Sequence, residues 1–569
     1  MLSDLILQAV QKAADTITPS KKTVTLSHPE TLAHGDFSCS IALQLAKELK
    51  QNPLEIAKKI AAIIDKGNLI EKIEVLPPGF INIFVKPGIL LQEASHFTSL
   101  DNKTPISQIN LEKEAIVEYS SPNIAKPFTV GHLRSTIIGD AVANLLEATG
   151  YKVYRDNHLG DWGTQFGKQI YAIKHLGENN EQMIESSEKP IAELVKLYVK
   201  FHEEAEKDPS IEDKAREYFK QLEDGDPEMR RLWKRCIEWS FKEFDTIYKK
   251  LGVTFTENNG RGYGESFFED KMDAVLHELE TKLSNEFKEN KNAKLVYFPN
   301  DKYPPLMIIK QDGATLYSTR DLATDNFRKN NYPNVSLVIN EVGAEQSLYF
   351  QQLYEVEKML GWFTDGQRVH VKHGMYRFKD MKMSTRKGNV IWLEDVLDEA
   401  RKKALDLIKD DTNDIADAIS IGALKWNDLK RSSHLDIVFD WDDILNMHGN
   451  SGPYMQYAYV RTLSILNKAG EIKDLKGDST ALNEDDLTLL KQFYKYPEVV
   501  ELAAKNYEPH LLTTYLYELA QTFSAFYQKN QILKADPAER TNRLLITKAT
   551  SNIIKHGLSL LGIQTVEKM

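Results

Sequence analysis

The chain has 569 residues, 42% of them hydrophobic and 27% charged, and its formal net charge is −11. This length exceeds what one hydrophobic core usually supports, so we expect two to four domains. The acidic balance argues against a uniformly basic surface of the kind that coats nucleic acid, although local basic patches are compatible with it.

Two features of the sequence favour a cytoplasmic protein. Cys39 and Cys236 are far apart and fit no metal-ligand spacing, which favours a reducing compartment. The first stretch, MLSDLILQAVQKAADTI, lacks the basic leader and long apolar core of a signal peptide, and no stretch is long enough to cross a bilayer.

Residues 1 to about 108 are predicted to form a compact α+β unit. Helical periodicity appears in IALQLAKEL and in LEIAKKIAAIID, and Pro53 is expected at the start of the second helix. The stretch VLPPGFINIFV reads as a strand entered through a Pro-Pro-Gly turn, and LDNKTPISQIN reads as a linker.

A strand–helix–strand unit is predicted next. AIVEYSS is a short apolar run, YKVYRD is a second one, and Gly150 is a plausible C-cap for the helix between them. That helix has apolar residues four apart, which are Leu133, Ile137, Ala141 and Leu145. Such a unit builds a parallel sheet whose ligand site lies at the carboxyl ends of the strands.

The remainder of the chain is predicted to contain a helical insertion, further strands and a helical bundle. Residues 180 to 250 are charged and helical, and we expect KLVYFP, LMIIKQ, VSLVINE and RVHVKHG to rebuild the sheet from distant sequence. After about Asn446 nearly every stretch has helical periodicity, which predicts a bundle.

The stretch SSPNIAKPFTVGHLRS, residues 120–135, has the composition of a ligand-binding turn between a strand and a helix. The free N–H groups and the dipole at a helix start suit a phosphate, and His132 in the first turn can add a hydrogen bond. Asn123 at the strand end can orient a polar substrate. The alternative is a capping histidine and a turn asparagine without a ligand.

A second stretch, KMSTRKGN at residues 382–389, is cationic and ends near a glycine. Cations in such a loop can close over a polyphosphate and neutralise charge on a leaving pyrophosphate. The alternative is a solvated basic loop.

These two stretches, 252 residues apart from His132 to Ser384, resemble the paired signatures of class I aminoacyl-tRNA synthetases. Within that class the chain resembles the arginyl-tRNA synthetases over nearly its whole length. The matching stretches are SPNIAKPFTVGHLRSTIIGD, NHLGDWGTQFG, LYSTRDLAT, GAEQSLYFQQL and NSGPYMQYAYVR, with LAHGDFSCSIALQLAK and PPGFINIFV near the N-terminus and LLGIQTVEKM at the C-terminus.

The resemblance implies an α/β fold with a Rossmann-like parallel-sheet catalytic domain, an N-terminal α+β added domain and a C-terminal all-α bundle. We expect the added domain at 1–108, where it would contact tRNA. The catalytic domain is expected at 109–447, with a helical insertion near 170–260, and the anticodon-binding domain at 448–569.

The implied reaction is the ATP-dependent ligation of L-arginine to tRNA(Arg) through arginyl-adenylate, with release of pyrophosphate and AMP. Mg²⁺ is expected with ATP, and no tightly bound protein metal is expected. The resemblance further implies that adenylate formation needs bound tRNA. We expect a monomer without a membrane partner.

The family's arginine-binding residues map onto nine positions: Glu118, Ser121, Pro122, Asn123, His132, Glu265, Tyr317, Asp321 and Gln346. The resemblance places Asn123 on the α-amino group, with Glu118 in support, and Gln346 at the same end of the substrate. It places Tyr317 and Asp321 on the guanidinium, with Glu265 as a second partner. A carboxylate suits this role because it accepts two parallel N–H bonds from a planar guanidinium. The alternatives are a surface ion pair between Asp321 and Arg320 and a core position for Tyr317.

ATP contacts are implied for Gly131, His132, Lys382, Met383 and Ser384. The catalytic residues are expected to be His132, Thr129, Lys382, Arg386 and Lys387. Two of these positions depart from the usual family pattern. Thr129 stands where the first signature usually begins with histidine, and Thr385 stands where the second usually has lysine, so we expect Arg386 or Lys387 to supply that cation.

Contacts with tRNA are predicted for Tyr457, Arg461 and Phe37, since aromatic rings and arginine planes stack on unpaired bases. The alternatives are core packing for the tyrosines and stabilisation of the N-terminal domain for Phe37. The turn Gly160–Gly163 is expected to be structural, with Trp162 packed beneath the site.

Two other functions remain open from the sequence. One is a nucleotidyl-transferring enzyme on the same fold that acts without RNA. The other is a non-catalytic RNA-binding paralogue, for which the two threonine departures leave room.

Overall fold

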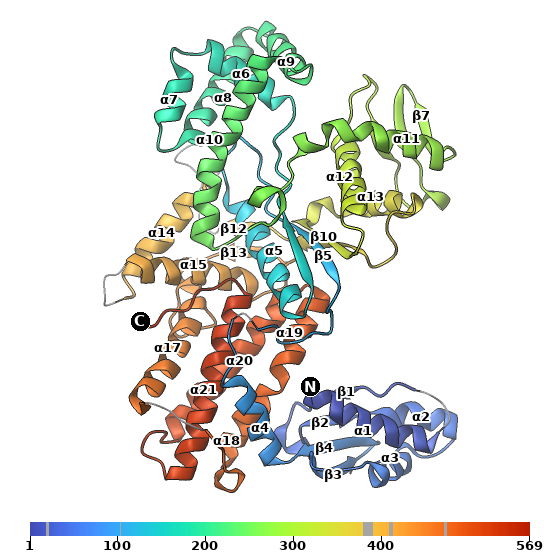
Figure 1. Cartoon of the computed structure of the whole chain (residues 1–569), viewed down its shortest axis with the longest axis vertical. Coiled ribbons are helices and arrows are strands. Elements are labelled where there is room, and N and C mark those ends of the chain that lie inside the picture. The colour runs from blue at the N-terminus through green and yellow to red at the C-terminus, as the bar shows by residue number, and fades with distance from the viewer. Residues whose placement is uncertain (19–21, 103, 379–390, 409–412, 471–474) are drawn as a thin grey trace.

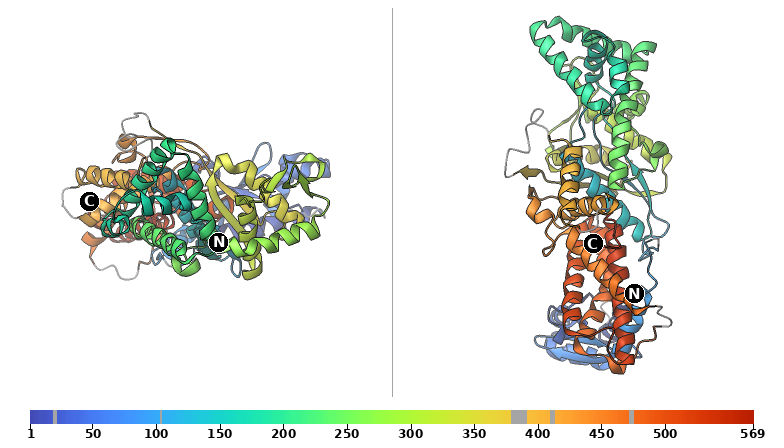
Figure 2. Two further views of the ribbon diagram at one scale, coloured as in Figure 1. Left: turned by 90° about the horizontal axis from the view of Figure 1, so that it is seen from above. Right: turned by 90° about the vertical axis from the view of Figure 1, so that its left-hand side faces the viewer.

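The computed structural model describes residues 1–569 except 19–21, 103, 379–390, 409–412 and 471–474. The molecule is elongated, with a parallel sheet near its middle, a helical insertion at one end and a helical bundle at the other (Figure 1). The N-terminal unit lies beside the far end of the bundle, as the second view in Figure 2 also shows.

The N-terminal unit is a four-stranded antiparallel sheet with helices packed on it, as predicted. Its strand order is β1-β2-β4-β3. The second predicted helix begins where expected, because Asn52 caps it by accepting a 2.8 Å hydrogen bond from the Leu54 N–H and Pro53 occupies the first turn. The elements are α1 (Leu2–Ile17), β1 (Leu26–Ser27), β2 (Phe37–Cys39), α2 (Ile41–Leu49), α3 (Pro53–Ile63), β3 (Ile70–Leu76), β4 (Phe80–Val85) and α4 (Pro87–Phe97).

The central sheet is parallel and has the order β11-β10-β5-β6. Its strands are β5 (Glu114–Glu118), β6 (Lys152–Asp156), β10 (Val335–Gly343) and β11 (Arg368–His373). The helix α5 (Val130–Ala148) joins β5 to β6, as the apolar periodicity predicts, and all four of the apolar residues spaced four apart are buried.

The sheet is covered on both faces, which explains why its two central strands, β5 and β10, carry consecutive buried apolar residues. Val117 and Ile339 pack in the cluster that contains α5, whereas Ile116 and Val338 pack in a second cluster with α12 (Tyr317–Asn331) and α13 (Ser347–Met359). Successive residues of one strand therefore pack into different hydrophobic clusters.

One strand assignment from the sequence is wrong. KLVYFP and LMIIKQ do form strands, but these do not join the parallel sheet. They pair with a third strand in a separate antiparallel sheet of order β7-β8-β9, made of β7 (Phe287–Asn290), β8 (Ala293–Val296) and β9 (Leu306–Ile309). Only VSLVINE and RVHVKHG extend the central sheet.

Helices occupy most of the chain outside the sheets. One group of helices follows β6 in the chain and projects away from the central sheet (Figure 1). Its members are α6 (Gln165–His175), α7 (Asn180–Ser186), α8 (Pro190–Lys207), α9 (Ser210–Glu223) and α10 (Pro227–Leu251). Between this group and the antiparallel sheet lie the 3₁₀ segment η3 (Glu265–Lys271) and α11 (Met272–Lys282).

The C-terminal part is a helical bundle, as its periodicity predicts. Its members and the helices that lead into it are α14 (Leu393–Leu405), α15 (Asn413–Leu429), α16 (Trp441–Ile444), α17 (Gly452–Ala469), α18 (Glu484–Phe493), α19 (Lys495–Asn506), α20 (Pro509–Lys529) and α21 (Pro537–Leu560). A short two-stranded parallel sheet of β12 (Tyr376–Phe378) and β13 (Ile437–Phe439) lies near its start.

Polar contacts join the N-terminal unit to the bundle. His28 Nε2 lies 2.7 Å from Glu498 Oε2, and Lys491 Nζ lies 3.3 Å from Asp36 Oδ1. The helix α4 also packs against α18 and α21.

Candidate active site

The turn that links β5 to α5 fixes the side chain of His132. Thr129 is the N-cap residue of α5, and its backbone N–H donates a 2.9 Å hydrogen bond to His132 Nδ1. Because Nδ1 accepts this bond, the proton of the neutral imidazole is on Nε2. Burial, with His373 nearby, lowers the pKa of His132 to about 4, so the ring is neutral at pH 7 and presents a single N–H donor.

The threonine departure in the first signature also has a structural role. The Thr129 hydroxyl oxygen lies 3.1 Å from His132 Nδ1, so this side chain orients the histidine. Gly131, one residue before it, is exposed at the start of the helix. The positive end of the helix dipole therefore lies at the carboxyl edge of the sheet.

The chain that follows the second signature is paired with the first signature. The Val130 N–H donates to the Ile391 carbonyl at 3.1 Å, and the Leu393 N–H donates to the Phe128 carbonyl at 2.9 Å. An isolated bridge also pairs Thr129 with Trp392. The tertiary structure thus brings the residue two positions after Asn389 into contact with the start of α5.

The second signature itself lies outside the described residues. This applies to all the positions predicted from KMSTRKGN, namely Lys382, Met383, Ser384, Thr385, Arg386 and Lys387. Their predicted roles in ATP binding and catalysis remain predictions.

Asn123 is exposed and is held by backbone pairing with the next loop of the sheet. The Ile124 N–H donates to the Gly160 carbonyl at 3.1 Å, and the Gly160 N–H donates to the Pro122 carbonyl at 3.2 Å. A Cβ atom at position 160 would lie 2.4 Å from Asn123 Oδ1, so glycine is required there for this side-chain position. Of its neighbours, Ser121 is exposed and Pro122 is buried.

Asp321 lies on α12, one turn after Tyr317, as the four-residue spacing predicts. The Tyr349 hydroxyl donates to the Asp321 carboxylate, and the Tyr317 ring packs edge-on against Tyr349 with centroids 4.8 Å apart. Both predicted residues therefore contact one tyrosine. Tyr317 is 56% exposed, which excludes the alternative that it is a core residue.

The environment of Asp321 compensates its negative charge only in part. Burial raises the pKa of Asp321 to about 6, although His158 and the Tyr349 hydroxyl act in the opposite direction. Its sequence neighbour Arg320 pairs with Glu269 at 2.7 Å, so the alternative of an Arg320–Asp321 ion pair is wrong. A cationic ligand would compensate this carboxylate.

Glu265, on η3, interacts electrostatically with Asp321 and His158. Its backbone N–H donates to the Leu159 carbonyl at 3.0 Å, and burial raises the pKa of its side chain to about 7. His158 and Asp321 both act on this pKa, which places Glu265 in the same group of charges. Gln346, by contrast, is exposed in η5 (Ala344–Gln346), directly after β10.

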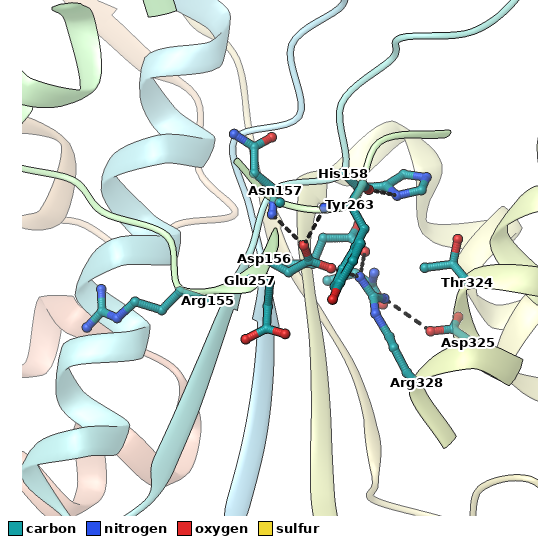
Figure 3. Close-up of polar contacts among 12 residues, drawn as sticks. Arg155, Asp156, Asn157, His158, Glu257, Tyr263, Thr324, Asp325 and Arg328 are labelled. Atoms are coloured by element: carbon teal, nitrogen blue, oxygen red, sulfur yellow. Dashed lines mark hydrogen bonds and ion pairs between the residues drawn. The ribbon is translucent and has the colours of Figure 1, made fainter. Parts of the chain in front are cut away.

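Glu118, another arginine-site prediction, interacts electrostatically with His158, but its charge is paired with Arg328. It is buried at the end of β5 and forms an ion pair with Arg328 of α12. Arg328 also binds Asp156 at 2.8 Å and Asp325 at 3.1 Å (Figure 3). Burial opposes its ionisation, but Arg328 and His158 outweigh burial and lower the pKa of Glu118 to about 2. The contacts of Glu118 therefore tie α12 to the sheet, because its charge is already paired with Arg328.

Comparison with known proteins assigns the chain to a family. Three family models match consecutive stretches: "tRNA synthetases class I (R), catalytic domain" at residues 97–441, "DALR anticodon binding domain" at 455–569 and "Arginyl tRNA synthetase N terminal domain" at 1–85. The arginine–tRNA ligase of Clostridium perfringens is 42% identical over 545 residues, which is 94% of each chain. The chain belongs to the arginyl-tRNA synthetase family. The resemblance that its motifs indicated is therefore confirmed.

Further relatives agree with this assignment. The arginine–tRNA ligase of Clostridium botulinum strain Alaska E43 is 39% identical over 576 residues, which is all of this chain and 99% of the relative. The crystal structure of arginyl-tRNA synthetase from Plasmodium falciparum has a TM-score of 0.82 at 25% identity and covers 100% of this chain and 99% of its own. The Thermus thermophilus arginyl-tRNA synthetase, at 23% identity, has a TM-score of 0.84 with full coverage of both chains and shows the same fold.

The predicted fold class is that of this family: an α/β catalytic domain with a parallel sheet, together with a C-terminal helical domain. Within the described residues no helix is long and apolar enough to span a membrane. The same residues contain no group of three or more histidines, cysteines and acids placed to hold a metal ion.

A groove of about 960 Å³ lies in the bundle of this family member, between α17 and the end of α20. Tyr457 and Arg461 line it, as does Tyr527, and the Arg461 guanidinium lies 4.9 Å and 5.8 Å from the centres of the two rings. Its rim also carries three lysines, which are Lys468, Lys529 and Lys534. Aromatic planes beside cations are the groups that bind unpaired nucleotides.

Phe37 does not have the exposure that an RNA contact needs. It is only 1% exposed, and its ring packs 5.1 Å from His28 and 5.3 Å from Tyr494. The structure therefore favours the alternative role, in which Phe37 stabilises the N-terminal unit and its contact with the bundle.

Trp162 is buried, but its neighbours are in the helical insertion. Its ring packs against Trp233 and Phe219, and the Arg230 guanidinium lies 5.0 Å from its centre. This tryptophan therefore anchors α9 and α10 next to the loop after β6, which differs from the predicted position beneath the ligand.

Sequence reasoning missed two residues that contact Asp321. His158 lies within the motif NHLGDWGTQFG, and Tyr349 lies within GAEQSLYFQQL, so both motifs were noted without these side chains. The available signal was their position in the segments that follow β6 and β10, at the edge where a parallel sheet binds its ligand.

Proposed function

We propose that this chain joins L-arginine to its tRNA in two steps, as a class I aminoacyl-tRNA synthetase. In the first step a carboxylate oxygen of arginine attacks the α-phosphorus of ATP, and the bond to pyrophosphate breaks. In the second step a terminal ribose hydroxyl of the tRNA attacks the carbonyl carbon of the adenylate, and AMP leaves. Family membership supports this reaction.

The observation that carries the proposal is the pairing of residues 391–393 with residues 128–130. This pairing brings the chain two residues after the second signature to the helix start that carries His132. Both signatures can then act on one triphosphate, which is what in-line displacement at the α-phosphorus requires.

His132 would donate the hydrogen on Nε2 to a phosphate oxygen of ATP. The bond from the Thr129 N–H to Nδ1 supports this role, because it leaves Nε2 as the donor. A neutral donor also avoids an ion pair that would hold the leaving pyrophosphate in place. Gly131 would let a phosphate approach the backbone N–H groups at the start of α5.

The arginine side chain would extend towards α12. Asp321 would accept two parallel N–H bonds from the guanidinium, with Tyr317 beside it and Glu265 as a second acid. The elevated pKa values of Asp321 and Glu265 support this placement, because each carboxylate lacks a full counter-charge in the free protein. Asn123 and Gln346 would bind the amino-acid end, with Ser121 and Pro122 shaping the loop.

Lys382, Arg386 and Lys387 are proposed to neutralise the leaving pyrophosphate, with Met383 and Ser384 beside the nucleotide. Mg²⁺ is proposed to arrive with ATP as part of the substrate. We further propose that the protein works as a monomer in the cytoplasm.

The groove lined by Tyr457 and Arg461 is proposed to hold unpaired bases of the tRNA anticodon loop. The position of the Arg461 guanidinium beside the Tyr457 ring and the basic rim support this use. The match of residues 455–569 to an anticodon-binding domain supports the same location.

A charging assay with each of the twenty amino acids and total tRNA tests the function. Only arginine should be attached, and attachment of another amino acid would refute the proposal. Arginine-dependent exchange between pyrophosphate and ATP should disappear when the tRNA is digested first. Exchange that survives digestion would favour a nucleotidyl transferase that needs no RNA, and no exchange with intact tRNA would favour a non-catalytic RNA-binding protein.

A further inference from the structure

His158 faces the guanidinium end of the proposed arginine site, yet no role has been given to it. It lies two residues after β6, its side chain is 12% exposed, and its ring packs 5.7 Å from Phe268. His158 Nδ1 lies 3.0 Å from the backbone oxygen of Tyr263 (Figure 3). A carbonyl oxygen only accepts hydrogen bonds, so Nδ1 carries a hydrogen in every protonation state of this ring.

The other ring nitrogen is therefore the one that changes. Among the described residues His158 Nε2 has no hydrogen-bond partner, and it lies 3.7 Å from Asp321 Oδ1. In the neutral ring Nε2 would direct a lone pair at the Asp321 carboxylate, which is unfavourable. With a second proton on Nε2 the ring becomes a cation beside that carboxylate.

The charges around His158 favour the cation. Three acids from different elements face it: Asp321 on α12, Glu118 on β5 and Glu265 on η3, while Arg328 on α12 opposes them. Asp161, in the same loop, also interacts with it. Burial lowers the pKa of His158, but the acids outweigh burial, and the pKa ends above its ordinary value.

We propose that His158 is a specificity-determining residue of the arginine site, which holds a proton as the counter-ion of Asp321 in the free protein and releases it when the guanidinium binds. This inference rests on the proposed function. The proton passes from Nε2 to the solvent, and no other bond is made or broken. Nε2 then accepts a hydrogen bond from a guanidinium N–H while Asp321 accepts others.

This arrangement discriminates between substrates by charge and by shape. A guanidinium carries a permanent positive charge, so it replaces the lost charge of His158 beside Asp321. It also has several N–H donors in one plane, enough to serve both the carboxylate and the imidazole. Citrulline, which has arginine's shape but no charge, would leave the proton on His158 and would not gain the bond to Nε2.

The protonation state of His158 can be followed directly by NMR. The protein is labelled with ¹³C at histidine Cε1, and the His158 signal is the one missing from a His158→Asn variant. If that variant does not fold, His158→Gln supplies the assignment. As a control, His175→Asn removes the signal of a histidine in the helical insertion that hydrogen-bonds to Tyr218 at 2.8 Å.

The expected result is that the His158 signal at pH 7 has the shift of an imidazolium in the free protein and moves to that of a neutral ring at saturating arginine. The His175 signal should not move. Citrulline at the same concentration should leave the His158 signal in place. A His158 signal that reports the same protonation state with and without arginine would overturn the inference.

Calorimetry on the same samples separates this inference from the proposed function. Asp321 and Glu265 also ionise near neutral pH, so the pH dependence of affinity alone does not identify the group that loses the proton. The calorimeter is therefore used only to establish arginine binding and its loss in Asp321→Asn. If arginine does not bind the wild-type protein, the proposed function fails. If it binds and the His158 signal stays unchanged, only the inference fails.

Discussion

Replacing Asp321 by asparagine should make the free protein more stable while weakening its affinity for arginine. The asparagine carbonyl oxygen can still accept the hydrogen bond from the Tyr349 hydroxyl, and its amide group can donate towards His158. The variant therefore removes a charge without leaving its neighbours unpaired. The site would lose the carboxylate that we propose for the guanidinium.

The gain in stability follows from the pKa of Asp321. Its ordinary value is 3.8, and burial raises it to about 6 in the folded protein. A shift of about two units corresponds to about 3 kcal/mol. Because the folded state holds the proton more tightly, the ionised carboxylate costs nothing below pH 3.8, and its cost grows through the window from 3.8 to about 6. Above that window the variant should gain up to about 3 kcal/mol in the free energy of unfolding.

Two measurements on the same preparations test this reasoning. Urea denaturation at pH 4 and at pH 7.5 should show little gain at the lower pH and the full gain at the higher one. Calorimetry at pH 7.5 should show a loss of about 2–4 kcal/mol in arginine binding, with ATP binding little changed. The control is Asp273→Asn, which neutralises an exposed aspartate on α11.

Either of two results would refute the argument. A variant that is less stable than wild type at pH 7.5 would mean that Tyr349 and His158 together outweigh the cost of burying the Asp321 charge. Unchanged arginine affinity would remove Asp321 from the binding pocket.

Three more predictions concern the ATP end, the loop after β6 and the bundle. His132→Ala should lower the rate of adenylate formation by about 10²- to 10³-fold. Since the pKa of His132 is about 4, protonation of this residue should not lower the wild-type rate above pH 5. Gly160→Ala would place a Cβ atom 2.4 Å from Asn123 Oδ1 and should raise the KM for arginine about tenfold or more, ~1.4 kcal/mol, while Gly88→Ala, where the nearest atom is 3.8 Å away, should not. Tyr457→Ala should weaken tRNA binding by about 1–3 kcal/mol in a filter-binding assay, and unchanged binding would exclude the groove as a base-stacking site.

Much of the fold follows from local patterns. The apolar residues of α5 repeat every four positions, and Gly150 ends the segment with a φ of +98° that favours glycine. The turn residues before β4 and the cap before α3 are likewise readable from neighbouring letters. Such features depend on hydrogen bonds and side-chain contacts within a few residues, so the sequence is enough to predict them.

The partners of the strands were not predictable in the same way. KLVYFP and VSLVINE have similar apolar composition, yet one joins an antiparallel sheet and the other joins the parallel one. A strand's own sequence satisfies neither its backbone N–H groups nor its carbonyls. The sheet that a strand joins therefore depends on which strand edge the folded chain places beside it.

Burial of single side chains was the other limit. Phe37 and Tyr457 are both aromatic residues in stretches that resemble the family, but one is enclosed by His28 and Tyr494 and the other lines an open groove. The enclosing residue Tyr494 is more than 450 positions away in the chain. No local pattern reports such a contact.

By itself the sequence determined the helices, the turn that carries His132, the acid–tyrosine pair on α12 and, through its motifs, the family. Only the tertiary structure decided that Ile391 pairs with Val130, that Glu118 is neutralised by Arg328, and that His158 faces Asp321. The physical reason is that a helix or a cap is stabilised by groups close together in the chain. A charge in a pocket is instead stabilised or left uncompensated by groups that only folding brings within a few ångströms.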